Sequence, residues 1–433
     1  MAGNTTNQNS IDPIRKREFS RRRLLKGLGV LGTVGLTPSV ADSARAAPGE
    51  PVALQYFHET WSTITNNLPT VADRGYDVIW IQAPQKSRLT WADQGGRNDP
   101  PLGYQPVDFR DFNSAFGTAS ELQTLIDTAH SHGIEVYLDC VMNHMADGRG
   151  YDFPAFSNPD FHHCCGQIDD WNDEHEVKNG ELLGLPDLEQ ESSYVRGELY
   201  NYMKKISDFG ADGYRYDAAK HMPHWFFQDY ANQWADEFGL ERVGEVYDGG
   251  VSYVQAYIDT GMNAFDYPLF YTISDVFSGG DMSKLQGAGV RAQDPFHAWP
   301  FVDNHDQDGP SQYELAHAHI LTSEGYPILY NIYPDWLLDN DTINNMIWVR
   351  KNLSGGETYW RYTDSNLVVY ERDSNLLVGL NNSSSQQSAS VTTSWANTTL
   401  HDHSGNAGDV SVAGDGSVQI AVPAEGWVFY APT

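Results

Sequence analysis

Short apolar runs that turn polar at their carboxyl ends recur along the first 330 residues of the chain. Residues 52–56 predict a first strand, and residues 77–82 form a near-continuous apolar run that suits a strand buried on both faces. Four later runs begin apolar and end in charged or amide side chains: residues 136–144, 210–217, 241–248 and 299–307. Strands that end in polar groups just before helices are typical of a (β/α)8 (TIM) barrel, which carries its chemistry at those strand ends.

Helical patterns alternate with these runs. The apolar spacing predicts helices over residues 120–131, 222–238 and 340–352, and Gly133 is placed to end the first of them. Further segments predict strands 6, 7 and 8 over residues 263–268, 301–307 and 326–330. The alternation of strands and helices therefore predicts a parallel sheet closed into a barrel.

The acidic residues at the strand ends fit the repeat of such a barrel. Asp217 and Glu245 lie 28 residues apart, which is about one β-α repeat, and Glu245 and Asp306 lie 61 apart, which is about two. We therefore place Asp139, Asp217, Glu245 and Asp306 on strands 3, 4, 5 and 7.

The remaining segments predict four regions. The stretch between strands 3 and 4 is longer than a helical connection needs, and its first part is rich in Asp, Asn, Gly, Pro and His. From about residue 360 the chain changes to short alternating strands separated by Ser, Asn and Gly turns. We expect a barrel (47–144 and 194–360), a small inserted domain after strand 3 (145–193), a C-terminal antiparallel β-sandwich (361–433) and a leader (1–46).

The leader has the features of an export signal. Residues 20–26 read Ser-Arg-Arg-Arg-Leu-Leu-Lys, a weakly apolar stretch follows, and Ala44-Arg45-Ala46 suits a cleavage site. This pattern predicts a twin-arginine signal peptide and a secreted, extracellular protein. A disordered basic tail or an anchor helix is the alternative.

The chain is strongly acidic. It carries 27 Lys and Arg against 58 Asp and Glu, a net charge of −31. Eight of the basic and three of the acidic residues lie in 1–46, so the rest carries 19 basic and 55 acidic residues, a net charge of −36. Such a charge argues against nucleic acid as a partner and is best tolerated where salt screens it, which predicts a halophilic protein. An ordinary acidic secreted enzyme is the alternative.

No apolar run has the length of a membrane span, and we expect a monomer without a membrane partner in the mature form. Three cysteines do not make a disulfide framework. Cys140 lies in an apolar run and suits a buried position, whereas Cys164 and Cys165 are adjacent in a loop. The adjacent pair can form a disulfide, contact a metal or stay as thiols.

The residues at strands 4 and 5 suit a reaction that needs two carboxyl groups. Alternation along strand 4 puts Arg215 and Asp217 on one face, where Arg215 can hold Asp217 ionised. Glu245 has no cation beside it in the sequence and can hold a proton more readily. An ionised carboxylate as nucleophile and a protonated one as general acid are the pair that glycoside hydrolysis with retention uses.

The four polar-ended segments resemble the signature regions of the α-amylase family of glycoside hydrolases in order, residue types and spacing. The resemblance runs from about residue 50 to the C-terminus, and the acidic composition and leader make the chain most similar to a secreted haloarchaeal member. It implies an endo-acting α-amylase that cuts α-1,4 bonds of starch or glycogen. The implied catalytic residues are Asp217 as nucleophile, Glu245 as general acid and base, and Asp306.

The resemblance also implies the substrate contacts. Tyr104 in the segment Gly103-Tyr104 would stack on the sugar at the cleavage point. Lys220 and His221 would contact sugar on the leaving-group side. The other implied contacts to the α-glucan are His144, Arg215 and His305. Asp139 is expected to support Arg215.

Within the insertion, Leu185-Pro186-Asp187-Leu188-Glu189 resembles the short signature of the family's domain B, which contains a calcium ligand. By that resemblance Asn143, Asp187 and the main-chain carbonyl of His221 bind Ca²⁺. Oxygen ligands from separate segments suit this hard cation, which would join the insertion to strands 3 and 4.

Other functions remain open at this point. Within the same fold, the chain can be a transglycosylase, an exo-acting enzyme or an α-1,6-cleaving one. The pair Lys220-His221 favours an endo-acting enzyme, again by resemblance. A non-catalytic carbohydrate-binding protein is the alternative of another class, and such relatives typically lack a catalytic carboxylate.

Overall fold

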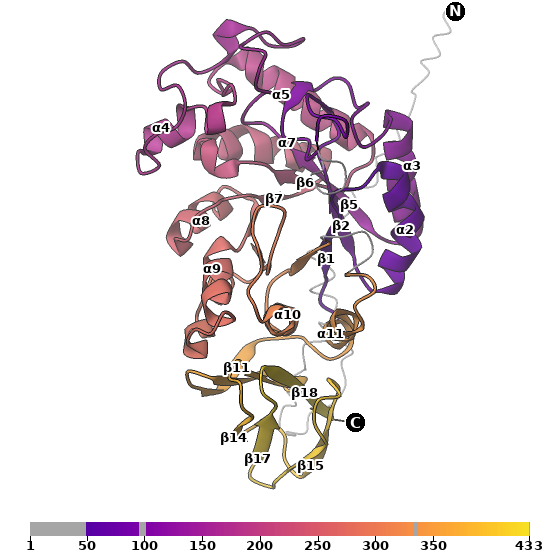
Figure 1. Ribbon diagram of the computed structural model, residues 1–433, viewed down its shortest axis with the longest axis vertical. Helices are drawn as coiled ribbons and strands as arrows, with labels where there is room; N and C mark the ends of the chain where they lie inside the picture. Colours follow the sequence, from indigo (N-terminus) through magenta and orange to yellow (C-terminus); the bar gives the residue numbers. More distant parts are fainter. Residues whose placement is uncertain (1–48, 95–100, 332–336, 433) are drawn as a thin grey trace, which may run out of the picture. The chain divides into compact units, whose positions relative to one another are not determined.

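The computed structural model describes residues 49–94, 101–331 and 337–432 (Figure 1). The predicted export signal at 1–46 lies outside the described residues. Among the described residues, no helix combines the length and the apolar character that crossing a membrane requires.

Eight strands form one parallel sheet that curls into a barrel. Their order is β10-β1-β2-β5-β6-β7-β8-β9. The N–H groups of Tyr326 and Ile328 donate to the carbonyls of Ala298 and Pro300, each at 2.9 Å, and so bring the β10 edge back to β9. The strands are β1 (Ala53–Gln55), β2 (Val78–Ile81), β5 (Glu135–Cys140), β6 (Gly213–Tyr216), β7 (Glu241–Gly244), β8 (Asn263–Phe265), β9 (Ala298–Trp299) and β10 (Ile328–Tyr330). The predicted (β/α)8 barrel is confirmed.

Helices cover the outside of this sheet. They are α2 (Trp61–Asp73), α3 (Ala119–Ser131), α5 (Ser193–Asp208), α6 (His224–Phe226), α7 (Asn232–Phe238), α8 (Val251–Ile258), α9 (Tyr267–Val276), α10 (Tyr313–Thr322) and α11 (Asp341–Asn352). Thr118 and Glu121 form a capping box that starts α3, and Gly133, with φ of 75°, follows its end. The helix expected over residues 222–238 is divided, because a π-turn (Phe227–Ala231) separates α6 from α7.

Aromatic side chains fill the inside of the barrel. Trp80, Tyr137, Phe265 and Trp299 are all buried in one cluster there. Gly213 is needed at this level, because a Cβ on it would lie 2.6 Å from the ring of Tyr137. The interior is therefore a packed core, and the space for chemistry lies above it, at the carboxyl ends of the strands.

Strand 7 differs from the prediction. It comprises only Ala298–Trp299, because Pro300 has no N–H to donate to a continuing ladder. Residues 301–307 therefore form a loop, in which Asn304 and Gln307 make an isolated bridge. Asp306 lies in this loop rather than at a strand end.

The segment between β5 and α5 holds little regular structure. It contains the short helix α4 (Glu174–Asn179), two 3-10 turns (Asn158–Asp160 and Leu182–Gly184) and a core of Phe153, Phe156 and Phe161. Isolated bridges pair His144 with Asp187 and Phe161 with Leu188. A small hairpin, β3 (Lys86–Ser87) with β4 (Pro106–Asp108), lies between β2 and α3.

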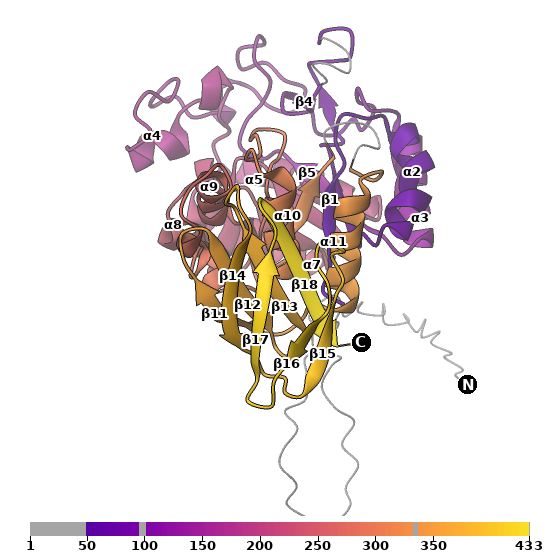
Figure 2. The same cartoon turned by 60° about the horizontal axis from the view of Figure 1, so that its bottom comes forward.

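The C-terminal residues form two antiparallel sheets (Figure 2). Six strands have the order β11-β12-β13-β18-β15-β16, and β14 pairs with β17. They are β11 (Thr358–Thr363), β12 (Leu367–Arg372), β13 (Leu376–Asn381), β14 (Gln387–Thr392), β15 (Thr398–Asp402), β16 (Val410–Val412), β17 (Ser417–Val422) and β18 (Gly426–Pro432). The expected C-terminal antiparallel β domain is confirmed.

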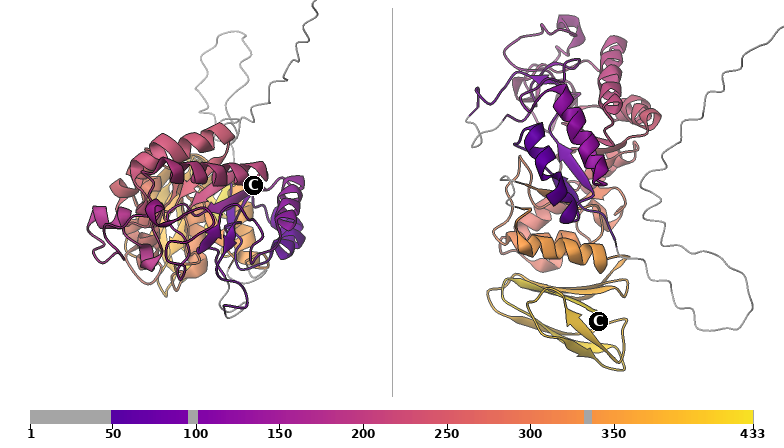
Figure 3. Two further views of the ribbon diagram at one scale, coloured as in Figure 1. Left: turned by 90° about the horizontal axis from the view of Figure 1, so that it is seen from above. Right: turned by 90° about the vertical axis from the view of Figure 1, so that its right-hand side faces the viewer.

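Helices α10 and α11 lie between the barrel strands and these sheets (Figures 1 and 3). Polar groups join the C-terminal sheets to the barrel helices. The Asn382 side-chain amide donates to the carbonyls of Val276 and Gly280, and Nη1 of Arg372 donates to that of Thr322.

Candidate active site

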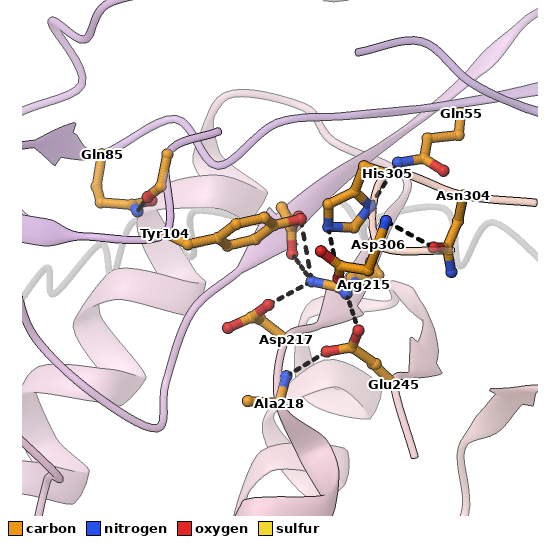
Figure 4. Close-up of polar contacts among 12 residues, drawn as sticks. Gln55, Gln85, Tyr104, Arg215, Asp217, Ala218, Glu245, Asn304, His305 and Asp306 are labelled. Carbon is orange, nitrogen blue, oxygen red and sulfur yellow. Dashed lines mark hydrogen bonds and ion pairs between the residues drawn. The ribbon is translucent and has the colours of Figure 1, made fainter. Parts of the chain in front are cut away.

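One guanidinium organises the carboxyl ends of the central strands (Figure 4). Nη1 of Arg215 lies 2.8 Å from Oδ1 of Asp139 and 2.6 Å from Oδ1 of Asp217. Nη2 lies 2.9 Å from Oε1 of Glu245. The guanidinium carbon also lies 4.8 Å from the centre of the Trp80 ring. Arg215 is 1% exposed, so a single buried cation contacts three carboxyl groups.

The register of the strands explains this convergence. Asp139 on β5 pairs with Arg215 on β6, and Tyr216 on β6 pairs with Gly244 on β7. Asp217 and Glu245 are the next residues on each strand, and neighbouring strands run about 4.8 Å apart. The alternation places Tyr214 and Tyr216 on the other face, in the core shared with the helices.

The two predicted catalytic carboxyl groups are close and differ in their contacts. Because they contact the two terminal nitrogens of one planar guanidinium, their bonded oxygens lie within about 8 Å of each other. Both oxygens of Glu245 are engaged: Oε2 accepts from the Ala218 N–H at 2.9 Å, and Oε1 also accepts from the Tyr267 hydroxyl. Oδ2 of Asp217 has no hydrogen bond with any described residue, and so one oxygen of this carboxyl is held while the other is available.

The protonation argument made from the sequence needs correction. Glu245 does have a cation beside it, namely Arg215, which is distant in sequence from Glu245 but adjacent across the sheet. Burial raises the pKa of Asp217 well above its ordinary value, although Arg215 opposes this shift. Burial raises the pKa of Asp139 in the same way, and it raises the pKa of Asp306 to about 6. One guanidinium does not balance this many carboxylates, so the ligand-free cluster favours holding a proton.

Tyr104 lies over the cluster. Its hydroxyl donates to Oδ2 of Asp139 at 2.6 Å, and its ring stacks on that of His305 at 5.3 Å between centres. Nε2 of His144 lies 3.0 Å from the Tyr104 carbonyl and so supports its backbone. Burial lowers the pKa of His144 to about 4, so it is neutral, and this nitrogen is already used. In this structure His144 therefore contacts the backbone of Tyr104.

The loop after β9 brings His305 and Asp306 to the same place. The Gln55 amide donates to Nδ1 of His305 at 2.8 Å, which puts the ring proton on Nε2. Burial lowers the pKa of His305 well below its ordinary value, so the ring is neutral. Nε2 lies 3.2 Å from Oδ2 of Asp306, without hydrogen-bonding geometry. Among the described residues, this nitrogen is thus a buried donor without a hydrogen-bond partner.

Lys220 and His221 lie on a 3-10 turn (Ala219–His221) after β6. Nζ of Lys220 donates to the Tyr247 carbonyl and to Oδ2 of Asp248, both at 3.1 Å. Nδ1 of His221 lies 3.0 Å from the Val177 carbonyl, in α4. The ring of Trp171, which is 49% exposed, meets His221 edge to face at 5.9 Å.

Two of the predicted calcium ligands fit a hard cation. Oδ1 of Asn143 and Oδ1 of Asp187 are buried acceptor oxygens without a hydrogen-bond partner among the described residues. The other oxygen of Asp187 lies 2.6 Å from Nδ1 of His162. Buried oxygens left without donors are what a hard cation would satisfy. The third predicted ligand, His221, is also buried.

Several contacting residues were missed by the sequence argument. Trp80, Tyr267 and the Ala218 N–H all contact the cluster, and His58, with φ of 68°, bonds the Tyr330 hydroxyl at the end of β10. Alternation along residues 77–82 could have placed Trp80 inside the barrel. No local signal indicates the others, because they depend on which strands become neighbours.

Comparisons with known proteins agree with this arrangement. Residues 55–308 match the family model described as the α-amylase catalytic domain, and residues 376–431 match the one described as the α-amylase C-terminal domain. A β/α-amylase of Paenibacillus polymyxa is 28% identical over 76% of this chain and 31% of its own length. An α-amylase of Aeromonas hydrophila is 35% identical over 44% of each chain.

A cyclomaltodextrin glucanotransferase of Geobacillus stearothermophilus is 27% identical over 76% of this chain and 55% of its own. The chain thus spans between about a third and just over half of the length of these relatives. Among solved structures, an α-amylase of Anoxybacillus superposes with a TM-score of 0.76 at 23% identity, over 89% of this chain and 98% of that one. At this identity the superposition shows the fold.

Proposed function

Because the chain belongs to the α-amylase family of glycoside hydrolases, we propose that it hydrolyses internal α-1,4-glucosidic bonds of starch and glycogen with retention of configuration. The observation that carries the proposal is the pair of buried carboxyl groups that directly follow β6 and β7 and share Arg215. Retaining enzymes need their two carboxyl groups about 5–5.5 Å apart, and the contacts of Asp217 and Glu245 are compatible with this spacing.

The contacts divide the roles. Oδ2 of Asp217 is available to attack the anomeric carbon while Arg215 holds Oδ1. As that bond forms, the glycosidic bond breaks and its oxygen takes the proton of Glu245. In the second step Glu245 removes a proton from water, the water oxygen bonds to the anomeric carbon, and the bond to Asp217 breaks. The cycle needs the proton on Glu245 and Asp217 ionised when the substrate is bound.

The neighbouring groups bind and orient the sugar. Tyr104 offers its ring, and Nε2–H of the neutral His305 donates to a hydroxyl. Asp306, once ionised, accepts from hydroxyls next to the cleaved bond. On the leaving-group side Lys220 and His221 contact the departing chain, whereas His144 acts by holding Tyr104.

We further propose a resident Ca²⁺ ion held by Asn143, Asp187 and the His221 carbonyl. The two buried oxygens without donors support it. Bound there, the ion would supply positive charge that joins the inserted segment to β5 and to the turn after β6. The chain's own residues at the cleavage point would then keep their spacing.

The proposal also covers secretion and adaptation to high salt. The twin-arginine leader and the net charge of −31 support a secreted, monomeric, halophilic enzyme of haloarchaeal type. Activity and the free energy of unfolding should both rise with NaCl up to molar concentration, because screening reduces repulsion between surface carboxylates.

A glucanotransferase is the second candidate, since a cyclomaltodextrin glucanotransferase is among the relatives. It would use the same two carboxyl groups, with a sugar hydroxyl in place of water in the second step. Cyclic or lengthened products from maltooligosaccharides would favour it, whereas shortening linear products favour hydrolysis.

The test compares two Asp→Asn variants on soluble starch, measured by viscosity and by new reducing ends. Asp217→Asn should lose hydrolysis while starch binding is kept. Asp415→Asn, the same change at an exposed site in the C-terminal domain, should behave as the unchanged protein. A fast fall in viscosity for few reducing ends indicates internal cleavage. Starch binding without any hydrolysis by the unchanged protein would favour a non-catalytic binding protein, and full activity of Asp217→Asn would refute the mechanism.

A further inference from the structure

A group of sulfur and imidazole side chains lies in the inserted segment, apart from the carboxyl cluster. The ligand atoms of Cys164, Cys165 and His175 all lie within 4.8 Å of one another. Cys164 and His175 are exposed and Cys165 is half-buried, so a solute can reach them. The structure has the two sulfur atoms joined as a disulfide.

The backbone around this group is well held. Glu181 N–H donates to the Gly166 carbonyl at 2.7 Å, and Gly180 N–H donates to the Glu176 carbonyl at 2.8 Å. Sγ of Cys164 lies 3.6 Å from the Asn179 carbonyl. These contacts keep the cysteine loop against the end of α4, the helix that carries His175.

His175 is held from the same side. The Asn179 side-chain amide lies 2.7 Å from the His175 carbonyl and 3.1 Å from its Nδ1. The helix α4 therefore fixes the position of the imidazole relative to the two sulfur atoms.

We propose that, when the cysteines are reduced, Cys164, Cys165 and His175 form a site for a thiophilic divalent cation such as Zn²⁺. Two thiolates and one imidazole are a ligand set that zinc prefers, and its fourth position would be open to solvent. Calcium prefers oxygen ligands, so this site is distinct in chemistry from the oxygens of Asn143 and Asp187. The inference does not depend on the proposed hydrolytic activity.

The surroundings favour a cation. Five carboxylates lie between residues 169 and 176: Asp169, Asp170, Asp173, Glu174 and Glu176. Their negative charge raises the local concentration of cations, and binding of the metal would release the thiol protons.

A metal here would also bear on the cleft. Helix α4 contacts the turn after β6 at two points: Val177 accepts from His221, and Nζ of Lys178 donates to the Lys220 carbonyl. A cation that joins the cysteine loop to His175 would therefore fix the helix that supports the leaving-group side of the site.

The test uses the whole protein saturated with Ca²⁺, and titrates Zn²⁺ against a chromophoric chelator. A phosphine reductant first opens the disulfide, giving two thiols while the phosphine takes up the oxygen of a water molecule. We expect one tight site per chain. Cys164→Ser, Cys165→Ser and His175→Asn should each weaken it at least about tenfold, the smallest effect that even an outer-shell partner has. His163→Asn is the matched control, because His163 contacts the Asn158 carbonyl instead, and it should bind as the unchanged protein.

Cd²⁺ provides a readout specific for sulfur. The reduced protein should show a thiolate-to-metal charge-transfer band that iodoacetamide treatment removes, and this measurement needs no variant. Equal zinc binding by the unchanged protein and the serine variants would mean that surface carboxylates bind the metal, and would overturn the proposal. So would the absence of the cadmium band in the reduced, unmodified protein.

Discussion

Replacing Arg215 by Met tests the view that one guanidinium holds the active-site carboxyl groups. The change keeps an unbranched side chain of similar length and removes the charge that contacts Asp139, Asp217 and Glu245 at 2.6–2.9 Å. Breaking a buried ion pair by removing one partner typically costs about 3–5 kcal/mol at neutral pH, because the remaining charge is uncompensated.

The cost should depend on pH in a defined direction. Burial already raises the folded-state pKa of Asp139 and Asp217, and Arg215 opposes the shift, so the variant should raise both further. A group with a raised folded-state pKa stabilises the fold at acid pH, and this contribution is lost as the pH rises through that pKa. For each extra proton that the folded variant holds, the difference in the free energy of unfolding between the two proteins therefore grows by about 1.4 kcal/mol per pH unit as the pH rises.

The assay is denaturant unfolding of both proteins at several pH values and one salt concentration. We expect a difference in the free energy of unfolding of about 3–5 kcal/mol at pH 7, falling to about 1–2 kcal/mol near pH 5. Arg350→Met is the control, because this equally buried arginine donates mainly to the carbonyls of Pro51, Ser323 and Gly325, which do not titrate. It pairs with one carboxylate, Glu50 at 3.3 Å, where Arg215 contacts three. A difference for Arg215→Met that is as flat with pH as that of Arg350→Met would refute the reasoning.

Three further predictions follow from single contacts. Gly213→Ala should lower the free energy of unfolding by about 1–3 kcal/mol, since its new methyl group meets the ring of Tyr137. Gly197→Ala, on α5 with no described atom near its Cβ position, should be neutral or stabilising in the same denaturation assay. Removing Ca²⁺ with a chelator should lower the free energy of unfolding by about 2.7 kcal/mol relative to calcium at 100 times its Kd. In Asn143→Ala, thermal unfolding should no longer depend on calcium. An unchanged dependence on calcium would argue against Asn143 as a ligand. Burial raises the pKa of Asp306 to about 6, and the role proposed for this residue needs its ionised form. The value of kcat/KM should therefore fall as the pH drops through about 6, and a profile flat down to pH 4.5 would contradict the role.

Much of the barrel could be predicted from the sequence, because its strands are local apolar runs bounded by polar residues. β2 lies within residues 77–82, β10 within 326–330, and α11 almost coincides with 340–352. Strand 7 was placed too far along the chain. Phe301 and Val302 continue the apolar run that starts before Pro300, whereas the ladder of the strand stops at Trp299.

The sequence predicted which residues meet at the site better than it predicted their charges and pKa values. Asp217 and Glu245 are neighbours because their strands are, which the spacing indicated. The cation next to Glu245 comes from another strand, and the burial of Asp217 outweighs its sequence-adjacent Arg215. Such effects depend on three-dimensional neighbours and on desolvation, and neither is written in local sequence.

The most direct test of the central claim is the anomeric configuration of the first product. The unchanged enzyme would cut a maltooligosaccharide in an NMR tube, and the new reducing end would be followed before mutarotation. Two carboxyl groups that act from β6 and β7 by double displacement predict that the α-anomer forms first. Initial release of the β-anomer would mean a single displacement by water, and would contradict the role given to Asp217.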